Sequence, residues 1–159
     1  MKSVYLETIL LVERLHRRFL DVIKTELDRL KIEDVNNVQT LILYNIGNEE
    51  LTIGELTNRG YYLGSNVSYN VKKLVENGFL VQERSPHDKR STRIKLSQKG
   101  LDLCGKIDAL YQRHIDDLQK HGTQLASALS STNTTLTQLE RFWTDYINQL
   151  FKLGQAGAA

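Results

Sequence analysis

The residues whose types and spacing suit chemistry are concentrated between positions 51 and 100. Apolar residues within 65–77 recur at helical spacing, and the opposite face of this predicted helix is polar and cationic, with no acidic residue before Glu76. Hydroxyl and amide groups near the start of such a helix suit base edges in a major groove, and lysines one turn later suit phosphates. The candidate DNA contacts on this helix are Ser65, Asn66, Ser68, Tyr69, Lys72 and Lys73.

A basic hairpin is predicted directly after this helix. As a strand, residues 79–84 would place Leu80, Gln82 and Arg84 on one side and Phe79, Val81 and Glu83 on the other. In residues 92–96, Thr92, Ile94 and Leu96 alternate with Arg93 and Lys95, as in a paired strand. Between the two strands, Pro86 presets a turn and Asp88 can accept hydrogen bonds from backbone amides, so the tip should hold a defined shape. From position 84 to position 99 the acidic residue is Asp88 alone, whereas the basic residues are Arg84, Lys89, Arg90, Arg93, Lys95 and Lys99.

The basic hairpin has two interpretations. A run of charge is often only the solvated side of a strand pair. The position of this one, directly after a helix suited to the major groove, favours a wing that contacts DNA beside that helix. In that case Lys89, Arg90 and Arg93 contact DNA, and Arg90 enters the minor groove, where narrow A·T-rich segments attract guanidinium groups.

These residues resemble the MarR (multiple-antibiotic-resistance) family of dimeric transcriptional regulators. That family's wing carries a D-x-R pattern before a strand and an L-[ST]-x-x-G pattern at the start of the next helix. The matching residues here are D-K-R at 88–90 and L-S-Q-K-G at 96–100. With the surrounding helical pattern, the resemblance covers nearly the whole chain. It implies a winged helix-turn-helix fold, a dimer built by the first helix and the last two, and a small, often aromatic or phenolic, effector that releases DNA.

Capping residues mark the helices that precede this segment. A helix is predicted to start at Asp34 or Asn36 and to stop at Gly47. Thr52, with Glu55 three residues later, forms a capping-box pattern at the start of a short helix. We therefore expect two helices ahead of the one that faces DNA.

The terminal segments are predicted to form apolar helices. Residues 4–30 carry apolar side chains over so wide a surface that this helix needs partners on more than one side. After the hairpin, Ser97 caps a long helix that continues to Leu129 unless Gly122 kinks it or ends it early. A polar break is predicted at 130–135, before a final apolar helix. Apolar helices at both ends suggest a platform shared by two subunits, as a protein that contacts two half-sites requires.

The predicted fold is therefore mainly α with a small β-hairpin wing, a winged helix-turn-helix joined to a helical dimerisation platform. We expect a single domain over 1–159. Within it, residues 1–33 and 101–153 form the helical dimerisation region and 34–100 form the DNA-binding region. The tail at 154–159 has nothing to bury and should be frayed.

Composition narrows the class of protein further. The 159 residues carry a net charge of +2, which is too small to indicate nucleic-acid binding, but the basic excess is concentrated in the hairpin. The single cysteine excludes an intrachain disulfide framework and fits a reducing cytoplasm. No apolar run suits a signal peptide or a membrane span, so we expect a soluble cytoplasmic protein that binds no membrane.

We predict no enzyme, no metal site and no cofactor. A Gly-rich phosphate loop, a nucleophile elbow and an H-E-x-x-H pattern are all absent. His114 and His121 lie two helical turns apart, too far for one metal ion without help from another element. Cys104 follows Leu103 on an apolar helix, which favours a buried structural thiol over a redox sensor, although some members of the resembled family sense oxidants through cysteine.

The resemblance also implies an effector site between the platform and the DNA-binding region. The corresponding segments offer His16, Phe19, Thr40, Tyr44, Tyr61 and Tyr111. An aromatic lining with a few hydroxyls suits a small aromatic acid or phenol, and Thr40 and Tyr44 lie one turn apart. The alternative is that these residues only complete the core, since aromatic residues at helical spacing usually pack.

We therefore expect a homodimeric transcriptional regulator that binds double-stranded DNA at a pseudo-palindromic operator and is released by a small aromatic or phenolic ligand. The alternative, from a different class, is a helical protein–protein adaptor that presents its winged helix to another protein. Binding to random-sequence duplex that weakens steeply as salt rises would separate the two.

Overall fold

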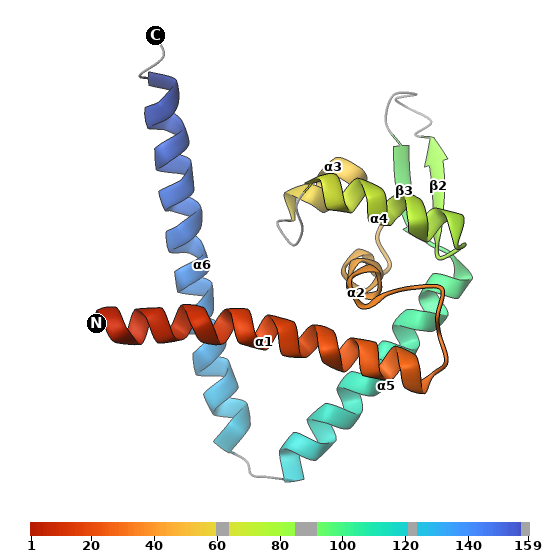
Figure 1. The fold of residues 1–159 in the computed structure, drawn as a ribbon, viewed down its shortest axis with the longest axis horizontal. Coiled ribbons are helices and arrows are strands. Elements are labelled where there is room, and N and C mark those ends of the chain that lie inside the picture. Colours follow the sequence, from red (N-terminus) through yellow and green to blue (C-terminus); the bar gives the residue numbers. More distant parts are fainter. Residues whose placement is uncertain (60–63, 85–91, 121–123, 157–159) are drawn as a thin grey trace. The chain divides into compact units, whose positions relative to one another are not determined.

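The computed structural model describes residues 1–59, 64–84, 92–120 and 124–156 (Figure 1). Its elements are α1 (Lys2–Arg29), α2 (Asn37–Ile46), β1 (Leu51–Thr52), α3 (Ile53–Asn58), α4 (Gly64–Glu76), β2 (Leu80–Arg84), β3 (Thr92–Leu96), α5 (Gln98–Lys120) and α6 (Gln124–Ala156). The chain divides into two compact units, Met1–Tyr111 and Gln112–Ala159. A mainly helical fold with a small antiparallel sheet confirms the predicted fold class.

The described strands form one antiparallel sheet in the order β1-β3-β2. The predicted hairpin is confirmed in its strands, where Leu80 lies opposite Leu96 and Gln82 lies opposite Ile94. β1, which pairs Leu51 with Ile94, is an element that the sequence pattern did not predict. A strand of two residues is too short to show alternation, and its pairing partner is remote in the chain.

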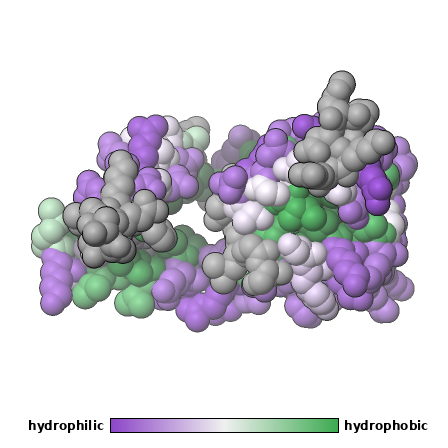
Figure 2. All heavy atoms as spheres, turned by 90° about the horizontal axis from the view of Figure 1, so that it is seen from above, coloured by the Kyte–Doolittle hydropathy of each residue, from purple (hydrophilic) through white to green (hydrophobic). Residues whose placement is uncertain are grey.

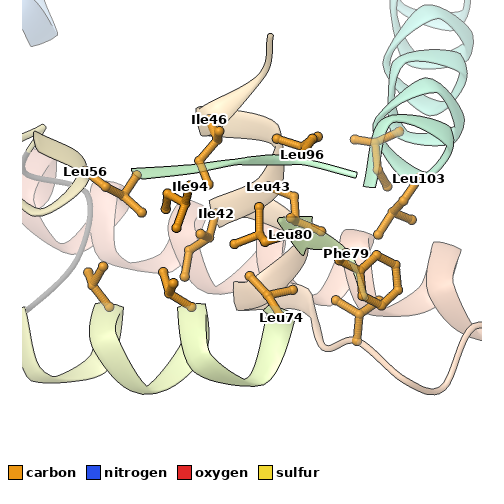
Figure 3. Packing of buried hydrophobic residues seen from close by; sticks show 14 of the residues in the cluster. Ile42, Leu43, Ile46, Leu56, Leu74, Phe79, Leu80, Ile94, Leu96 and Leu103 are labelled. Atoms are coloured by element: carbon orange, nitrogen blue, oxygen red, sulfur yellow. The ribbon is translucent and has the colours of Figure 1, made fainter. Parts of the chain in front are cut away.

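The hydrophobic core of the first unit contains residues from α1, α2, α3, α4, the sheet and α5 (Figure 3). α2 contributes Ile42, Leu43 and Ile46, all fully buried. Figure 3 shows Ile42, Leu43 and Leu80 lying between β3 and α4. Burying an aliphatic side chain of this size stabilises the fold by about 1.5–3 kcal/mol. The core therefore determines which face of α4 turns inward.

Capping residues start α2 and α3 as predicted. The Asn36 side chain accepts a hydrogen bond from the Gln39 amide at 2.8 Å, and the Gln39 side chain accepts one from the Asn36 amide at 3.1 Å. Thr52 and Glu55 form the same reciprocal capping box at the start of α3. Gly47 ends α2 with φ of +56°, a conformation that glycine adopts without steric cost.

A tight joint connects the end of α4 to the start of α5. The Ser97 hydroxyl donates to the Gly78 carbonyl at 2.6 Å and accepts from the Gly100 amide at 3.2 Å, so Ser97 caps α5 as predicted. A Cβ on Gly100 would lie 2.4 Å from the carbonyl oxygen of Phe79. The contacts among Gly78, Phe79, Ser97 and Gly100, hereafter the α4–α5 joint, give the L-S-Q-K-G pattern a structural role.

The C-terminal unit corrects one prediction. The polar break expected at 130–135 is wrong, because α6 is a continuous helix over Gln124–Ala156. The hydroxyls of Thr132, Thr134 and Thr135 donate to carbonyls four residues earlier at 2.9–3.1 Å. The threonine hydroxyls therefore form hydrogen bonds within α6, and the threonines do not end the helix. The final helix accordingly begins at Gln124.

The preceding helix is shorter than its longest predicted extent. α5 ends at Lys120 and does not reach Leu129. Gly122, the residue expected to kink the helix or end it early, lies outside the described residues. Among the helices that are described, none is both long and apolar enough to cross a membrane.

Large apolar side chains are exposed in each unit, taken separately. On α1, Val4, Leu10 and Leu15 are exposed by 63%, 65% and 56%. On α6, Phe142 and Ile147 are exposed by 58% and 50%. Figure 2 shows that one face of the molecule carries hydrophobic areas (green) among hydrophilic ones (purple). Isolated exposed apolar residues are common on protein surfaces, whereas contiguous exposed apolar patches are typical of interaction surfaces.

Candidate nucleic-acid interface

α4 separates an apolar inner face from a polar outer face. Val67, Val71 and Leu74 are buried, with exposed fractions of 0%, 2% and 0%, which confirms the predicted inward face. The candidate contacts on the outer face, Asn66, Ser68, Tyr69 and Lys72, are exposed, whereas Lys73 is half-buried and the side chain of Ser65 lies outside the described part. The outer face therefore presents amide, hydroxyl and ammonium groups to the surroundings.

The two lysines of this face differ in their surroundings. Lys73 Nζ lies 2.8 Å from a carboxylate oxygen of Glu76, and this hydrogen bond raises the pKa of Lys73 and lowers the pKa of Glu76. Lys72 lies 4.0 Å from the same carboxylate, and its side chain is 76% exposed. Glu76 partly neutralises Lys73 in the free protein. Lys72 is therefore better placed for a phosphate than Lys73, a distinction that the sequence did not make.

Two basic residues in the described part of the wing, Arg93 and Lys95, make local contacts within the protein. Arg93 Nη1 donates to the Glu50 carbonyl at 3.3 Å, across the β1–β3 side of the sheet. Lys95 pairs with Glu83 at 2.8 Å, which raises the pKa of Lys95. Arg93 is thus attached to the base of the wing. The hairpin tip, with the candidate contacts Lys89 and Arg90, lies outside the described residues.

Three of the six candidate effector residues form an aromatic cluster, comprising Phe19, Tyr44 and Tyr111. The ring centroids of Phe19 and Tyr111 are 6.0 Å apart in a stacked arrangement, and those of Tyr44 and Tyr111 are 5.1 Å apart at 84°. The Tyr44 hydroxyl donates to Oδ1 of Asp108 at 2.6 Å. This hydrogen bond, with partial burial, raises the pKa of Tyr44 to about 12. Burial likewise raises the pKa of Tyr111.

The remaining candidate effector residues are not part of the aromatic cluster. Thr40 is 1% exposed, and its hydroxyl donates to the Asn36 carbonyl at 2.9 Å. His16 is exposed on α1, one turn before Phe19, and Tyr61 lies outside the described residues. Sequence reasoning missed Asp108. Its spacing of three residues before Tyr111 placed it on the same helical face, but an exposed acidic residue gives no sign of its partner.

Cys104 lies on the same stretch of α5 and is half-buried. Burial, and secondarily the charge of Asp108, raises the pKa of the Cys104 thiol to about 11. A thiol with so high a pKa carries very little thiolate at neutral pH, and the thiolate is the reactive form. This supports the structural interpretation of Cys104 over the redox one.

A helix-turn-helix, α3–α4, that packs its second helix on an apolar core and is followed by an antiparallel hairpin defines a winged helix-turn-helix protein. Residues 33–91 match the model of the MarR family. The exopolysaccharide II synthesis transcriptional activator ExpG of Rhizobium meliloti (strain 1021) is 39% identical over 142 residues, covering 87% of this chain and 71% of that protein. The chain therefore belongs to the MarR family of transcriptional regulators.

Solved structures show the same fold. Streptococcus pneumoniae FabT, in a crystal structure with DNA, superposes with a TM-score of 0.71 at 15% identity and covers 89% of this chain and 98% of that chain. The reduced form of MarR from E. coli superposes with a TM-score of 0.66 at 18% identity, and the match covers 79% of this chain and 93% of that chain. At these identities the likeness concerns the fold alone.

Proposed function

We propose that this protein is a homodimeric transcriptional regulator that binds a pseudo-palindromic operator with α4 in the major groove. The observation that carries the proposal is the outer face of α4, which is polar and cationic while its inner valines and Leu74 hold the helix on the core. Membership of the MarR family supports it, as does the fold shared with FabT, which was crystallised with DNA. A helix held in this way can enter a groove without losing its own packing.

Within this proposal the contacts divide by chemistry. Ser65, Asn66, Ser68 and Tyr69 lie toward the start of α4 and would meet base edges, whereas Lys72, Lys73, Lys89, Arg90 and Arg93 would meet phosphates or the minor groove. Because Glu76 binds Lys73, the larger phosphate contribution is assigned to Lys72. The wing residues are assigned from their sequence position.

Dimerisation is proposed from the exposed apolar rows. Leu10 on α1 and Phe142 on α6 are more than half exposed. Exposed apolar residues continue each row at helical spacing, Leu6 one turn before Leu10 and Tyr146 and Leu150 one and two turns after Phe142. A second copy of the chain would cover such rows and would also supply the second α4 that a two-half-site operator requires. An isologous contact of this kind explains why both helices keep large apolar residues on their surfaces.

A small aromatic acid or phenol is proposed as the effector, with the aromatic cluster as its attachment point. The rings of Phe19 and Tyr111 offer stacking surface, and the Tyr44 hydroxyl offers a polar contact if its bond to Asp108 is exchanged for one to the ligand. Such a ligand would act by its higher affinity for the arrangement that does not bind DNA. If no aromatic acid or phenol releases DNA at high concentration, these residues serve the core alone.

The DNA-binding proposal is tested by selecting preferred sequences from a randomised duplex library and titrating the selected duplex at several salt concentrations. Asn66→Ala should lose about 1–3 kcal/mol of discrimination at particular base pairs. Lys72→Ala should weaken selected and random duplexes by the same factor and reduce the salt slope by about one. Lys106→Ala, an equal change of charge at an exposed position on α5, serves as the control.

The outcomes separate the candidate functions. A salt slope of several units, with a smaller slope for Lys72→Ala than for Lys106→Ala, supports DNA contact through α4. Equal losses for Asn66→Ala on selected and random duplexes would remove Asn66 from base recognition. Absence of salt-dependent binding to any duplex would favour the protein–protein adaptor instead.

A further inference from the structure

A chain of side-chain amides connects the start of α2 to the first turns of α4. The backbone amide of Asn36 donates to Oε1 of Gln39 at 3.1 Å. Nε2 of Gln39 donates to Oδ1 of Asn70 at 3.2 Å, and Nδ2 of Asn70 donates to the carbonyl of Asn66 at 2.8 Å. These residues, hereafter the amide relay, end at the residue proposed above to contact bases.

The direction of every hydrogen bond in the amide relay is determined by its two ends. The Asn36 amide can only donate, so the Gln39 side chain must turn its oxygen toward Asn36 and its nitrogen toward Asn70. The Asn66 carbonyl can only accept, so Asn70 must turn its nitrogen toward Asn66 and its oxygen toward Gln39. One arrangement of the two amides satisfies both ends, and a reversal of either would place two donors or two acceptors together.

Burial makes this arrangement costly to disturb. Gln39 is 6% exposed, and both ends of its amide have partners. Asn70 is half-buried, on the side of α4 between the core and the outer face. The valines on the inner face of α4 contribute non-directional packing, which tolerates small rotations of the helix. Hydrogen bonds are directional, so the amide relay restricts the rotation of α4 about its axis in a way that the valines do not.

We propose that Gln39 and Asn70 are positioning residues for DNA sequence recognition: through the amide relay they hold the first turns of α4, and with them Asn66, in the orientation that contacts base edges. This rests on the proposed function, because it assigns to two partly or fully buried residues a role in the selectivity of the same α4 face. Neither residue need touch DNA.

A neighbouring residue in the same turn provides a matched control. Asn37 Nδ2 donates to the Leu20 carbonyl of α1 at 3.1 Å, so Asn37 connects α2 to α1 and not to α4. Its Oδ1 also accepts a hydrogen bond from the Val38 amide at 2.8 Å, so loss of the Asn37 side chain removes two hydrogen bonds at the start of α2 and leaves the amide relay in place. Any effect that comes merely from loosening α2 should therefore appear in Asn37→Ala as well as in variants of Gln39.

The informative substitution is Gln39→Glu. A glutamate keeps an oxygen for the Asn36 amide, so the capping box at the start of α2 is preserved. It replaces the nitrogen that donates to Asn70 with a second oxygen. The Asn70 side chain then either loses its hydrogen bond to residue 39 or reverses to donate to the glutamate and loses its hydrogen bond to the Asn66 carbonyl. Asn70→Ala breaks the amide relay from the other side at a half-exposed helical position, where alanine favours the helix and folding is retained.

The experiment selects preferred duplexes from a randomised library with the full-length wild-type protein and then measures the affinity of each variant for the selected duplex and its single-base substitutions. Gln39→Glu and Asn70→Ala should each reduce the preference at the base pairs that Asn66→Ala affects by roughly five- to twenty-fold. Compared with the wild type, the affinity of each variant for random duplex should change by no more than about twofold. Melting temperature is recorded for each variant, because a purely structural role would lower it without altering base preference.

The double variant tests whether Gln39 acts through Asn70. If it does, Gln39→Glu has no further effect on base preference once Asn70 is alanine, whereas additive losses would overturn the proposal. Unchanged preferences in Gln39→Glu, or an equal loss in Asn37→Ala, would also overturn it. A wild-type protein that selects no sequence from the library would instead refute the proposed function itself, and the amide relay would lose its role with it.

Discussion

Replacing Gly100 with alanine should destabilise the protein by about 1–3 kcal/mol, the usual cost of forcing an extra methyl group into a packed site. The new Cβ would lie 2.4 Å from the Phe79 carbonyl oxygen and 3.2 Å from Cγ of Leu96. The first separation must therefore grow by at least 0.6 Å to reach the 3.0 Å below which such contacts essentially do not occur. The Phe79 carbonyl cannot move freely, because it accepts a hydrogen bond from the Ser97 amide at 3.0 Å. The gain in helix propensity, about 0.5–1 kcal/mol, offsets only part of this strain.

Gly105 on the same helix supplies the matched control. A Cβ at Gly105 would meet no atom within 4 Å, so Gly105→Ala should gain about 0.5–1 kcal/mol from helix propensity alone. Urea unfolding of both variants and the wild type, at one fixed chain concentration, measures the difference. Opposite signs for the two variants support the close approach at the α4–α5 joint. A Gly100→Ala protein as stable as Gly105→Ala would refute it.

Two further predictions concern the aromatic cluster and the dimer. The pKa of Tyr44 is raised to about 12 by its hydrogen bond to Asp108, so this bond stabilises the fold fully below pH 10 and the stabilisation is lost as pH rises from 10 to 12. Tyr44→Phe should lower the free energy of unfolding near pH 8 by about 1–2 kcal/mol, and the difference from wild type should shrink steadily as pH rises from 10 toward 12. A difference that stays constant over this range would show that the hydroxyl plays no part. Leu10→Glu should raise the dimer dissociation constant at least about tenfold in sedimentation, since burying a leucine contributes about 1.5–3 kcal/mol. Val81→Glu on β2, within the region assigned to DNA binding, where 38% of the valine is exposed, should not. Equal dissociation of both variants would count against α1 as the interface.

The features that the sequence predicts well are those with local causes. The inner face of α4 follows from the spacing of Val67, Val71 and Leu74, because a helix brings such residues onto one side whatever surrounds it. The capping box at Thr52 and the end of α2 at Gly47 depend on side-chain and backbone chemistry within a few residues. These elements therefore could be assigned before any tertiary contact was known.

The features that the sequence does not predict depend on partners remote in the chain, or on a competition between local effects. The pairing of Leu51 with Ile94, which creates β1, and the bond from Tyr44 to Asp108 both join segments more than forty residues apart. The threonines at 130–135 could either cap a new helix or bond back along an existing one, and propensity alone favours neither strongly. The polar residues of the amide relay likewise give no indication in the sequence that they meet.

The structure holds α4 at two places by different means. At the middle of the helix, Gln39 donates a directional hydrogen bond to Asn70. Past its end, the α4–α5 joint is reinforced by Lys99, whose ammonium group donates to the Asn77 carbonyl at 2.9 Å, pairs with Asp34 and lies 4.2 Å from the centre of the Phe79 ring. Contacts at both places oppose bending or unwinding of the helix between them, because either motion would break polar contacts at one of them. The proposed effector should therefore move α4 as a rigid body together with α2 and the start of α5, and should not reshape the face proposed to meet the bases.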